Sequence, residues 1–230
     1  MDRSTWLADR QANAEAYFDV LRAPTDPDDD WVTQEHLRFV DAVVESCPPA
    51  GLVLDAACGT GTFFGRILET GRSVIGIDQS AGMIAEARRR FPSVSLEKTS
   101  LQALRPDLRT DGVICVGAME FVFPEDWPAV LGKLRRAASG GAIYLNVEQI
   151  PAEAVAQAHA DLLADGLPAV LGETLRGGGY HFHPADSQVT NWLSEAGLAI
   201  IDEAWTSRPT YGYWHLLLRA NVGLPAFITG

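Results

Sequence analysis

Apolar runs and helix-like stripes alternate along the chain. The run Leu52–Ala57, interrupted at Asp55, has the pattern of a parallel strand buried on both faces, and it ends at Cys58. Six further strand-like runs follow, at 73–77, 94–96, 111–119, 142–147, 198–204 and 213–218. Between them, apolar residues recur every three or four positions, as on helices that cover a sheet. This alternation predicts an α/β fold, with the last two strands as an antiparallel pair.

Segments outside the strands are expected to cover this core as parts of a single domain. Two amphipathic helices precede the first strand, and a helix starting at Pro151 follows the fifth with a connection longer than the minimum. The expected parts are an N-terminal helical cap (1–48), a central core (49–149), a helical substrate-cap insertion (150–186), and a C-terminal helix with two strands (187–230). The acidic run at 26–30 lacks partner ligands at suitable spacing and predicts a solvated loop.

A glycine turn follows the first strand. Gly59 and Gly61 can take positive φ angles and let another molecule approach the main chain without a Cβ in the way. A helical stripe from Phe63 to Leu68 comes next. Such a strand, turn and helix direct backbone N–H groups and the positive end of the helix dipole at one point, which favours an anionic or carboxylate-bearing ligand. Asp55, near the strand end, can hold the N–H groups of the loop.

A second acid stands at the end of the next strand. The spacing from Gly61 to Asp78 suits a carboxylate that accepts hydrogen bonds from both hydroxyls of a ribose. An acid in this position is usually a helix cap, but Ser80 already supplies the cap of the following helix. This leaves Asp78 available for a ligand.

Two sequence motifs carry a family resemblance. The segment V-L-D-A-A-C-G-T-G resembles motif I of the class I S-adenosylmethionine (SAM)-dependent methyltransferases, which has an acid, two small residues and then C/G-G-T-G. The segment D-Q-S-A-G-M-I is similar to the D-x-S-x-x-M-L/I of the same family. The dinucleotide pattern G-x-G-x-x-G is not met, because Gly65 follows Gly61 by four positions. The resemblance covers Leu52 to Leu145 well and the whole chain in outline.

The resemblance implies a Rossmann-like, seven-stranded, mostly parallel sheet with helices on both faces and strand order 3-2-1-4-5-7-6. It also implies SAM as methyl donor and S-adenosylhomocysteine (SAH) as its product. Asp55 would lie near the amine of the methionyl part, Gly117 near the methyl donor, and Ser100 at the adenine amino group, where the family commonly has an acid. The expected cofactor contacts are Tyr17, Asp55, Ala57, Cys58, Gly59, Gly61, Asp78, Gln79, Met83, Ser100, Leu101 and Gly117.

Three residues are candidates for the base at the methyl acceptor. His181 and His183 lie in the densest polar and aromatic cluster of the chain, and Glu148 ends the fifth strand. Because the histidines are two positions apart, we expect them to point to opposite faces, with His181 toward the substrate beside the glycines at 177–179. The alternative is that both fill loop and core positions with satisfied hydrogen bonds. The aromatic residues expected to line a pocket for a planar or apolar acceptor are Phe121, Tyr180, Trp205, Tyr211 and Tyr213.

The composition of the chain limits the kinds of partner that we expect it to bind. The formal charge of -12 over 230 residues argues against a nucleic-acid surface, which needs clustered Lys and Arg. The three cysteines show no metal spacing and are expected to be reduced core residues, and no metal ion is expected. The N-terminus is charged and no apolar window reaches the length of a membrane span. We therefore expect a cytoplasmic protein without membrane partners, either a monomer or a homodimer.

The expected function is methyl transfer from SAM to a small-molecule acceptor, at oxygen, nitrogen or carbon, in specialised metabolism. One alternative keeps the fold and SAM but has no transfer activity, acting as a cyclase or a binding subunit. Another is a nicotinamide-dependent reductase, which would need the G-x-G-x-x-G spacing that the chain lacks. The N/D-P-P-Y/F sequence of DNA amino-group methylases is also absent after the fourth strand, where G-A-M-E stands instead.

Overall fold

The computed structural model describes residues 1–21, 31–177 and 179–221. The acidic run at 26–30 lies outside these ranges, so its prediction as a solvated loop stays a prediction. The glycine at 178 and the residues from 222 on lie outside them too. The three cysteines, Cys47, Cys58 and Cys115, are free and buried, as expected for reduced core residues.

A seven-stranded sheet forms the centre of the molecule, in the order β3-β2-β1-β4-β5-β9-β8. Its strands are β1 (Leu52–Ala56), β2 (Ser73–Asp78), β3 (Ser95–Lys98), β4 (Gly112–Cys115), β5 (Ala142–Gln149), β8 (Leu198–Ser207) and β9 (Gly212–Ala220). The first five are parallel, and β9 runs antiparallel to both β5 and β8. The predicted order 3-2-1-4-5-7-6 is confirmed, with different numbers because a separate hairpin supplies β6 and β7.

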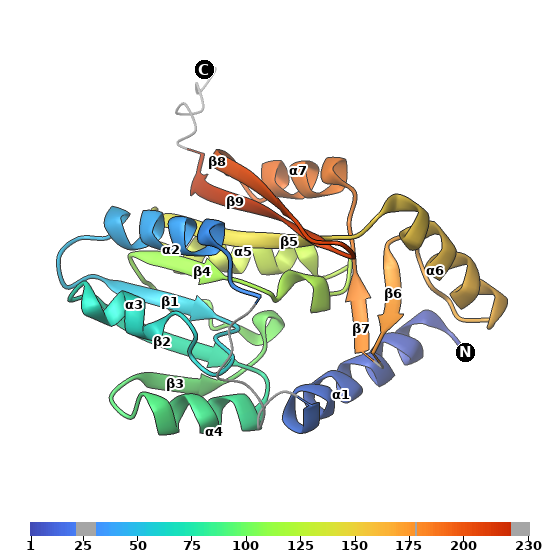
Figure 1. The fold of residues 1–230 in the computed structure, drawn as a ribbon, viewed down its shortest axis with the longest axis horizontal. Helices are drawn as coiled ribbons and strands as arrows, with labels where there is room; N and C mark the ends of the chain where they lie inside the picture. The colour runs from blue at the N-terminus through green and yellow to red at the C-terminus, as the bar shows by residue number, and fades with distance from the viewer. Residues whose placement is uncertain (22–30, 178, 222–230) are drawn as a thin grey trace, which may run out of the picture.

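Helices cover both faces of this sheet because successive residues of a buried strand point to opposite sides. Val53 packs with α2 (Gln34–Ser46), α3 (Phe64–Glu69) and α4 (Ala81–Arg90) on one face. Leu54 packs with α5 (Trp127–Ala137) and α7 (Asp186–Glu195) on the other face, as Figure 1 allows the reader to follow. The short 3-10 turns η1 (Leu101–Ala103) and η2 (Met119–Phe121) also contribute to this second side.

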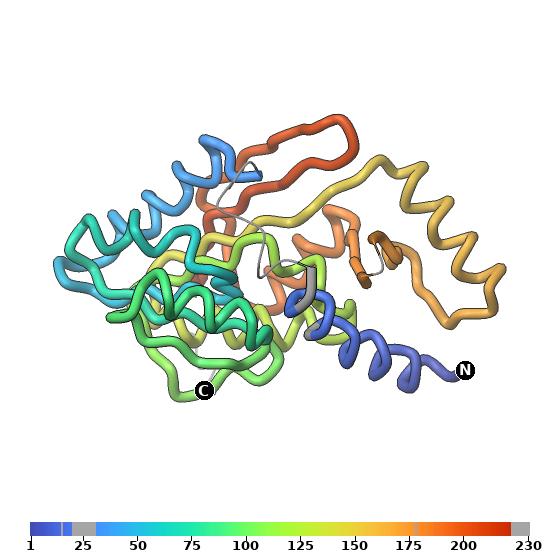
Figure 2. Tube along the Cα trace, turned by 60° about the horizontal axis from the view of Figure 1, so that its bottom comes forward, coloured from blue at the N-terminus to red at the C-terminus, as the bar shows by residue number. Residues whose placement is uncertain are grey.

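The insertion after β5 contains a helix and a β-hairpin. Helix α6 (Ala152–Ala164) leads into β6 (Glu173–Arg176), which pairs with β7 (Gly179–Phe182) in antiparallel register. Figures 1 and 2 show the hairpin between α6 and the N-terminal helix α1 (Arg3–Leu21), at one end of the sheet. The expected helical insertion is therefore present as α6, and it also contains a hairpin that the sequence did not predict. Arg176 pairs directly with Gly179, and Gly177 lies in the turn of this hairpin.

Helix α1 is anchored at both of its ends. Near its start, the Arg3 guanidinium donates to both oxygens of the fully buried Glu173, at 2.8 and 3.0 Å. Near its end, Asp19 accepts hydrogen bonds from the Ser80 hydroxyl at 2.5 Å and from the Gly82 N–H at 3.0 Å. The helix therefore bridges the hairpin and the first turn of α4. This position places its aromatic residues over the carboxyl ends of the parallel strands.

Candidate functional site

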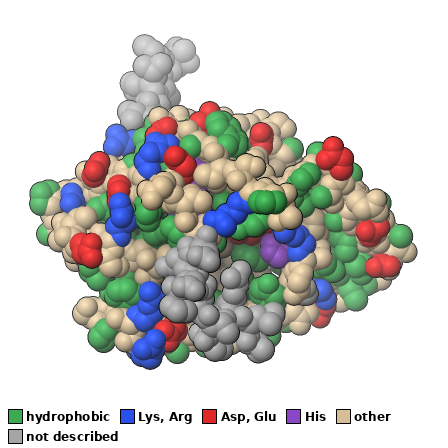
Figure 3. Space-filling view, viewed as in Figure 1, with side chains coloured by type: hydrophobic (Ala, Val, Ile, Leu, Met, Phe, Trp, Pro, Cys, Tyr) green, Lys and Arg blue, Asp and Glu red, His purple; other side chains and the backbone are tan. Residues whose placement is uncertain are grey.

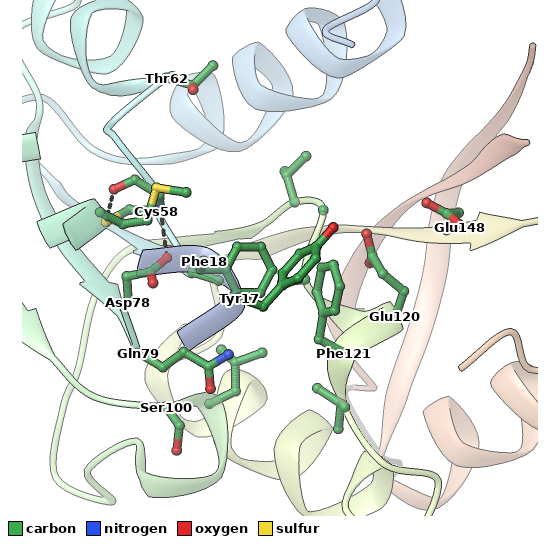
Figure 4. Close-up of a pocket in the computed structure, with 18 of the residues that line it drawn as sticks. Tyr17, Phe18, Cys58, Thr62, Asp78, Gln79, Ser100, Glu120, Phe121 and Glu148 are labelled. Carbon is green, nitrogen blue, oxygen red and sulfur yellow. Dashed lines mark hydrogen bonds between the residues drawn. The ribbon is translucent and has the colours of Figure 1, made fainter. Parts of the chain in front are cut away.

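A cavity of about 500 Å³ opens at the carboxyl ends of the parallel strands. Its walls come from the loops after β1, β2, β3 and β4, from the end of β5 and the start of β9, and from α1 and the hairpin. Ligands of open α/β sheets bind at this edge, where the strand order reverses. In the space-filling view, histidine and basic side chains border a hollow on this face (Figure 3). Figure 4 shows the cavity from within.

The loop after β1 is held by main-chain hydrogen bonds to β2. The Cys58 N–H donates to the Ile77 carbonyl at 2.8 Å, and the Gly59 N–H donates to Asp78 Oδ2 at 2.9 Å. Ala57 and Gly59 both have positive φ angles, 68° and 53°, so the chain turns sharply after the strand. These contacts fix the position of the loop before any ligand is bound.

Both oxygens of Asp78 take part in this arrangement. Oδ1 accepts a hydrogen bond from the Ser80 N–H at 2.8 Å, while Oδ2 accepts the one from Gly59. Burial raises the pKa of the Asp78 carboxyl, although the N–H groups of Ser80 and Gly59 oppose that shift. Each carboxylate oxygen has a second lone pair. Asp78 can therefore accept two ligand hydroxyls without releasing the loop.

Asp55 lies deeper in the same wall. Its side chain is buried, and Oδ2 has no hydrogen-bond partner among the described residues. Burial, and to a smaller extent the neighbouring Asp78, raise the pKa of Asp55 to about 8. The N–H of Gly59 goes to Asp78, so the expectation that Asp55 holds the loop is wrong for that group. An unpaired carboxyl oxygen in a cavity wall is suited to a cationic partner from a ligand.

Gly61 does not line the cavity. Its φ angle is +85°, and a Cβ built there would lie 2.6 Å from Phe64 Cδ2 and 3.1 Å from Phe91 Cδ2. The residue is needed for the turn and for close packing beneath the loop, which corrects its prediction as a cofactor contact.

The other expected cofactor residues line the cavity. Ser100 also caps η1, because its Oγ accepts the Ala103 N–H at 3.2 Å. Gly117 has a φ angle of +61° and donates its N–H to Asn146 Oδ1 at 2.8 Å. The cavity is also lined by Tyr17, Ala57, Cys58, Gln79, Met83 and Leu101.

An acidic pair lies at the opposite end of the cavity. Glu120 is 4% exposed, and its Oε2 has no hydrogen-bond partner among the described residues. Burial and the neighbouring Glu148 raise the pKa of Glu120 to about 8. Glu148 Oε1 accepts a hydrogen bond from Arg176 Nη1 at 2.7 Å. Figure 4 shows both carboxyl groups on the far side of Tyr17 and Phe121 from the loop after β1.

The two histidines point to the same side, contrary to the prediction. Residues two apart in a strand share a face, and the rings of His181 and His183 lie parallel, with centroids 6.2 Å apart. Only His181 lines the cavity. His183 is buried beside the Glu148 carbonyl and the Thr174 hydroxyl, each 3.4 Å from one of its ring nitrogens. Burial lowers the pKa of both histidines to about 4, so both are neutral at pH 7.

Three of the five expected aromatic residues line the cavity, namely Phe121, Tyr211 and Tyr213. Tyr180 packs edge-on to Trp6 and donates its hydroxyl to Glu173 at 2.8 Å, away from the main cavity. Trp205 is 55% exposed on the edge strand β8, with its ring stacked on Trp214. The prediction of a substrate contact is therefore corrected for Tyr180 and Trp205.

Comparison with known proteins identifies this arrangement. Residues 53–141 match the model of a methyltransferase domain family. This segment of the chain is therefore similar to the methyltransferase domain family. The family resemblance read from the two motifs is thus confirmed for this segment, which runs from β1 to the start of β5.

The alignments with curated relatives cover only part of each relative. The chain is 29% identical over 133 residues to trans-aconitate 2-methyltransferase of Methylobacterium nodulans, covering 51% of this chain and 50% of that protein. It is 32% identical over 105 residues to malonyl-(acyl-carrier protein) O-methyltransferase of Serratia marcescens, covering 44% and 39%. The chain thus spans half or less of the length of these curated relatives.

A solved structure extends the likeness of the methyltransferase domain to almost the whole fold. Magnesium protoporphyrin IX methyltransferase of Synechocystis, determined with bound SAH, superposes with a TM-score of 0.68 at 19% identity. The alignment covers 92% of this chain and 100% of that one. At this identity the likeness shows a shared fold.

Sequence reasoning missed several residues that line the cavity of the methyltransferase domain. Glu120 had a usable signal, because it is a lone acid within the apolar run from Val113 to Val122 at the end of a parallel strand. Arg176 had none, since an arginine beside glycines is common on any surface. The cavity-lining residues not predicted as site residues are Phe18, Trp31, Thr60, Thr62, Phe63, Thr99, Gln102, Val116, Ala118, Glu120, Val122, Arg176 and Gly177.

Unpartnered buried polar atoms concentrate at this cavity. In the part of the chain that the structure describes, five buried side-chain nitrogen or oxygen atoms have no hydrogen-bond partner. Three of them, Asp55 Oδ2, Glu120 Oε2 and His181 Nδ1, belong to residues that line it. Such atoms are rare in native proteins and cost free energy unless a ligand or water completes them.

Among residues 1–21, 31–177 and 179–221, no three His, Cys, Asp or Glu side chains gather in a way that could hold a metal ion. None of the helices in these ranges has the length and apolar character needed to cross a membrane.

Proposed function

We propose that this protein binds SAM and transfers its methyl group to a small-molecule acceptor. The observation that carries the proposal is one continuous cavity that joins the motif I loop and Asp78 to Glu120, Glu148 and His181. The three unpartnered polar atoms are distributed over both ends of this cavity. A site for two reactants, each meeting its own polar groups, requires this kind of arrangement.

The residues at the loop end fit SAM. Asp78 has lone pairs left for both ribose hydroxyls, and Asp55 offers an unpaired carboxyl oxygen to the ammonium of the methionyl part. A cation there would favour the charged form of Asp55 and lower its pKa. Ser100 and Leu101 line the wall where the adenine is expected. SAM supplies a methyl group on a sulfonium, which is reactive enough to need alignment and exclusion of water rather than a metal.

The remaining walls support an acceptor of small size. The hairpin, with Arg176 and His181, and helix α1, with Tyr17, close the cavity from the side opposite the loops. We therefore propose that residues 1–48 and 150–186 act as caps over the substrate. The formal charge of -12 supports a small-molecule acceptor over a nucleic acid. A cytoplasmic location, a monomer or homodimer, and a role in specialised metabolism are parts of the same proposal.

Calorimetry and a labelled-methyl assay test this function together. Wild-type protein is titrated with SAM, SAH and NADH, and a small-molecule library is then screened for label transferred from SAM. Binding of SAM and SAH but not NADH, with a labelled product, is the expected result. Binding without transfer would instead indicate a cyclase or a binding subunit. Binding of NADH alone would indicate a reductase and would contradict the proposal.

A further inference from the structure

The acceptor end of the cavity has more acidic than basic side chains. Two carboxyl groups, from Glu120 and Glu148, lie there within each other's electrostatic influence, and Arg176 donates a hydrogen bond to Glu148. His181 is neutral at pH 7 because burial lowers its pKa to about 4. Because its pKa is raised to about 8, Glu120 is largely protonated at pH 7 in the empty site, and a cation that enters the site favours its ionised form. With both acids ionised, this group of four side chains carries one uncompensated negative charge.

The two acids differ in the hydrogen-bond partners that they already have. Glu148 is paired with Arg176 at 2.7 Å and is also 3.9 Å from His183 Nδ1. Glu120, in contrast, comes from η2 at the end of β4 and is almost fully buried, with Oε2 unpartnered. Leaving a buried carboxylate unpaired is costly, unless a cation or a hydrogen-bond donor enters the site. The available position in this cluster is therefore on Glu120.

Aromatic rings surround this position from several elements. Phe121 lies with its ring centroid 4.9 Å from that of His181 and is in edge contact with Phe18 at 4.9 Å. Tyr211 and Tyr213 form a second edge contact at 5.5 Å on the opposite strand pair. Ring faces attract cations and pack against flat apolar groups. Acidic and aromatic groups together suit an ammonium that is attached to an aromatic or apolar body.

We propose that the methyl acceptor is an amine, and that Glu120 binds its ammonium group and takes the proton that must leave before transfer. The proposal rests on the function proposed above and names the substrate class of the same site. Glu148 and Arg176 keep the surrounding charge balanced, so that Glu120 is the group the amine meets. A carboxylate acceptor would stand against two acids whose only cationic neighbour, among the residues lining the cavity, is already paired.

The proton and electron balance of the step is complete with these groups. The ammonium gives one proton to the Glu120 carboxylate and becomes a neutral amine. The nitrogen lone pair then forms the bond to the methyl carbon, while the carbon–sulfur bond breaks and its electron pair remains on sulfur. The products are SAH, a methylated ammonium and protonated Glu120, which returns its proton to solvent. No oxidant, metal or further reactant is needed.

Three matched probes test the inference on protein loaded with SAH. Benzylamine, benzyl alcohol and benzoate share a ring and differ in the group that would meet Glu120, and calorimetry gives the affinity of each. We expect benzylamine to bind at least about tenfold more tightly than the other two. In Glu120→Gln this preference should be lost, while the affinity for SAH and the thermal unfolding temperature change little. Glu153→Gln, the same change at an exposed site on α6, should behave like wild type.

Each other outcome overturns the inference. Equal or tighter binding of benzyl alcohol or benzoate, an unchanged preference in Glu120→Gln, or no binding of benzylamine at millimolar concentration would each do so. The SAH titration reports separately on the proposed function. Bound SAH without an amine preference removes only the amine acceptor. If SAH itself does not bind, the proposed function fails and the inference that rests on it fails too.

Discussion

The two ends of the cavity are built from different kinds of interaction. At the donor end, the loop after β1 is fixed by main-chain groups, such as the Cys58 N–H to Ile77 and the Gly59 N–H to Asp78. At the acceptor end, the position of each group depends on charged side chains, above all the buried Glu120 and the half-buried pair Glu148 and Arg176. The first end has a shape that the backbone sets. The second has an electrostatic character that single side chains set.

This difference indicates where each end can vary. A main-chain site tolerates most side-chain changes but is sensitive to any Cβ or backbone rotation within the loop. A side-chain site can be changed by one substitution without disturbing the sheet, since its residues come from segments far apart in sequence. In such a fold the methyl donor can stay the same while single substitutions change the acceptor. The following predictions test the difference, from the largest expected effect to the smallest.

The largest effect is expected from an added methyl group beneath the donor loop. Gly61→Ala places a Cβ 2.6 Å from Phe64 at a φ angle of +85°, and we expect a loss of about 2–4 kcal/mol in the free energy of unfolding. Gly59→Ala is the matched control, because nothing lies within 4 Å of its built Cβ. It should cost only about 1–2 kcal/mol for the positive φ, while the methyl group enters the cavity and weakens SAH binding. Urea unfolding and calorimetry separate the two effects, and equal losses of stability would contradict the packing argument.

Removal of the Asp78 carboxylate is expected to affect the donor end next. Asp78→Ala should weaken SAM binding by about 1.5–3 kcal/mol, the range for hydrogen bonds to a charged group. The variant also releases the N–H groups of Gly59 and Ser80, so Asp78→Asn, which keeps an acceptor oxygen, should retain part of the affinity. Calorimetry with SAM measures both. Unchanged affinity in Asp78→Ala would remove this residue from the ribose site.

Asp55 makes the unliganded donor end dependent on pH. Folding raises the pKa of Asp55 from 3.8 to about 8. Between these two pH values the unfolded chain ionises before the folded one, so the free energy of unfolding decreases as the pH rises. Asp55→Asn should lack this contribution, so its stability relative to wild type should increase by about 1–3 kcal/mol between about pH 5 and pH 8. Asp78 shifts in the same direction, and part of the decline should remain. Urea unfolding of both proteins across this pH range would contradict the prediction if the two curves stayed parallel.

At the acceptor end, the two histidines should separate into a cavity residue and a packing residue. His181→Ala should lower turnover by at least about tenfold if the ring accepts a proton or orients the acceptor, with SAM affinity unchanged. His183→Ala should instead lower the free energy of unfolding by about 1–2 kcal/mol, because this ring is buried against Thr174 and the Glu148 carbonyl. Both are assayed with an acceptor found in the labelled-methyl screen. A His181→Ala enzyme at full speed would show that this ring neither accepts the proton nor orients the acceptor, which leaves the proton to Glu120.

The donor end could be predicted because its signals are local. Asp55, Gly59 and Asp78 lie at fixed distances from strand ends, and strand ends of a parallel sheet converge on one edge. Gly61 is a residue whose role cannot be predicted from such local signals. A glycine in a ligand loop looks the same in sequence whether its missing Cβ makes room for a ligand or for Phe64.

The acceptor end could be predicted only in part, because it is assembled from distant segments. Glu120, Glu148, Arg176 and His181 come from η2, β5, β6 and β7, and no spacing relates them. The hairpin that brings the last two into the wall was not predicted, because its segment was assigned to a helical cap. The error for the histidines was one of geometry, since the pleat places residues i and i+2 on one face.

The smallest effect is expected from Trp205, and it tests the strand geometry that separates cavity from surface. Trp205 is paired directly with Trp214, and directly paired side chains share a face of the sheet, whereas the adjacent Tyr213 points to the other face and lines the cavity. Trp205→Ala should therefore leave SAH affinity and turnover unchanged and cost about 0.5–1.5 kcal/mol of stability from the lost ring stack. Tyr213→Ala, eight residues away on the neighbouring strand, should instead weaken acceptor binding. If Trp205→Ala reduced acceptor affinity as much as Tyr213→Ala did, the acceptor would have to reach the edge strand, and the wall assigned to Glu120 and its neighbours would be incomplete.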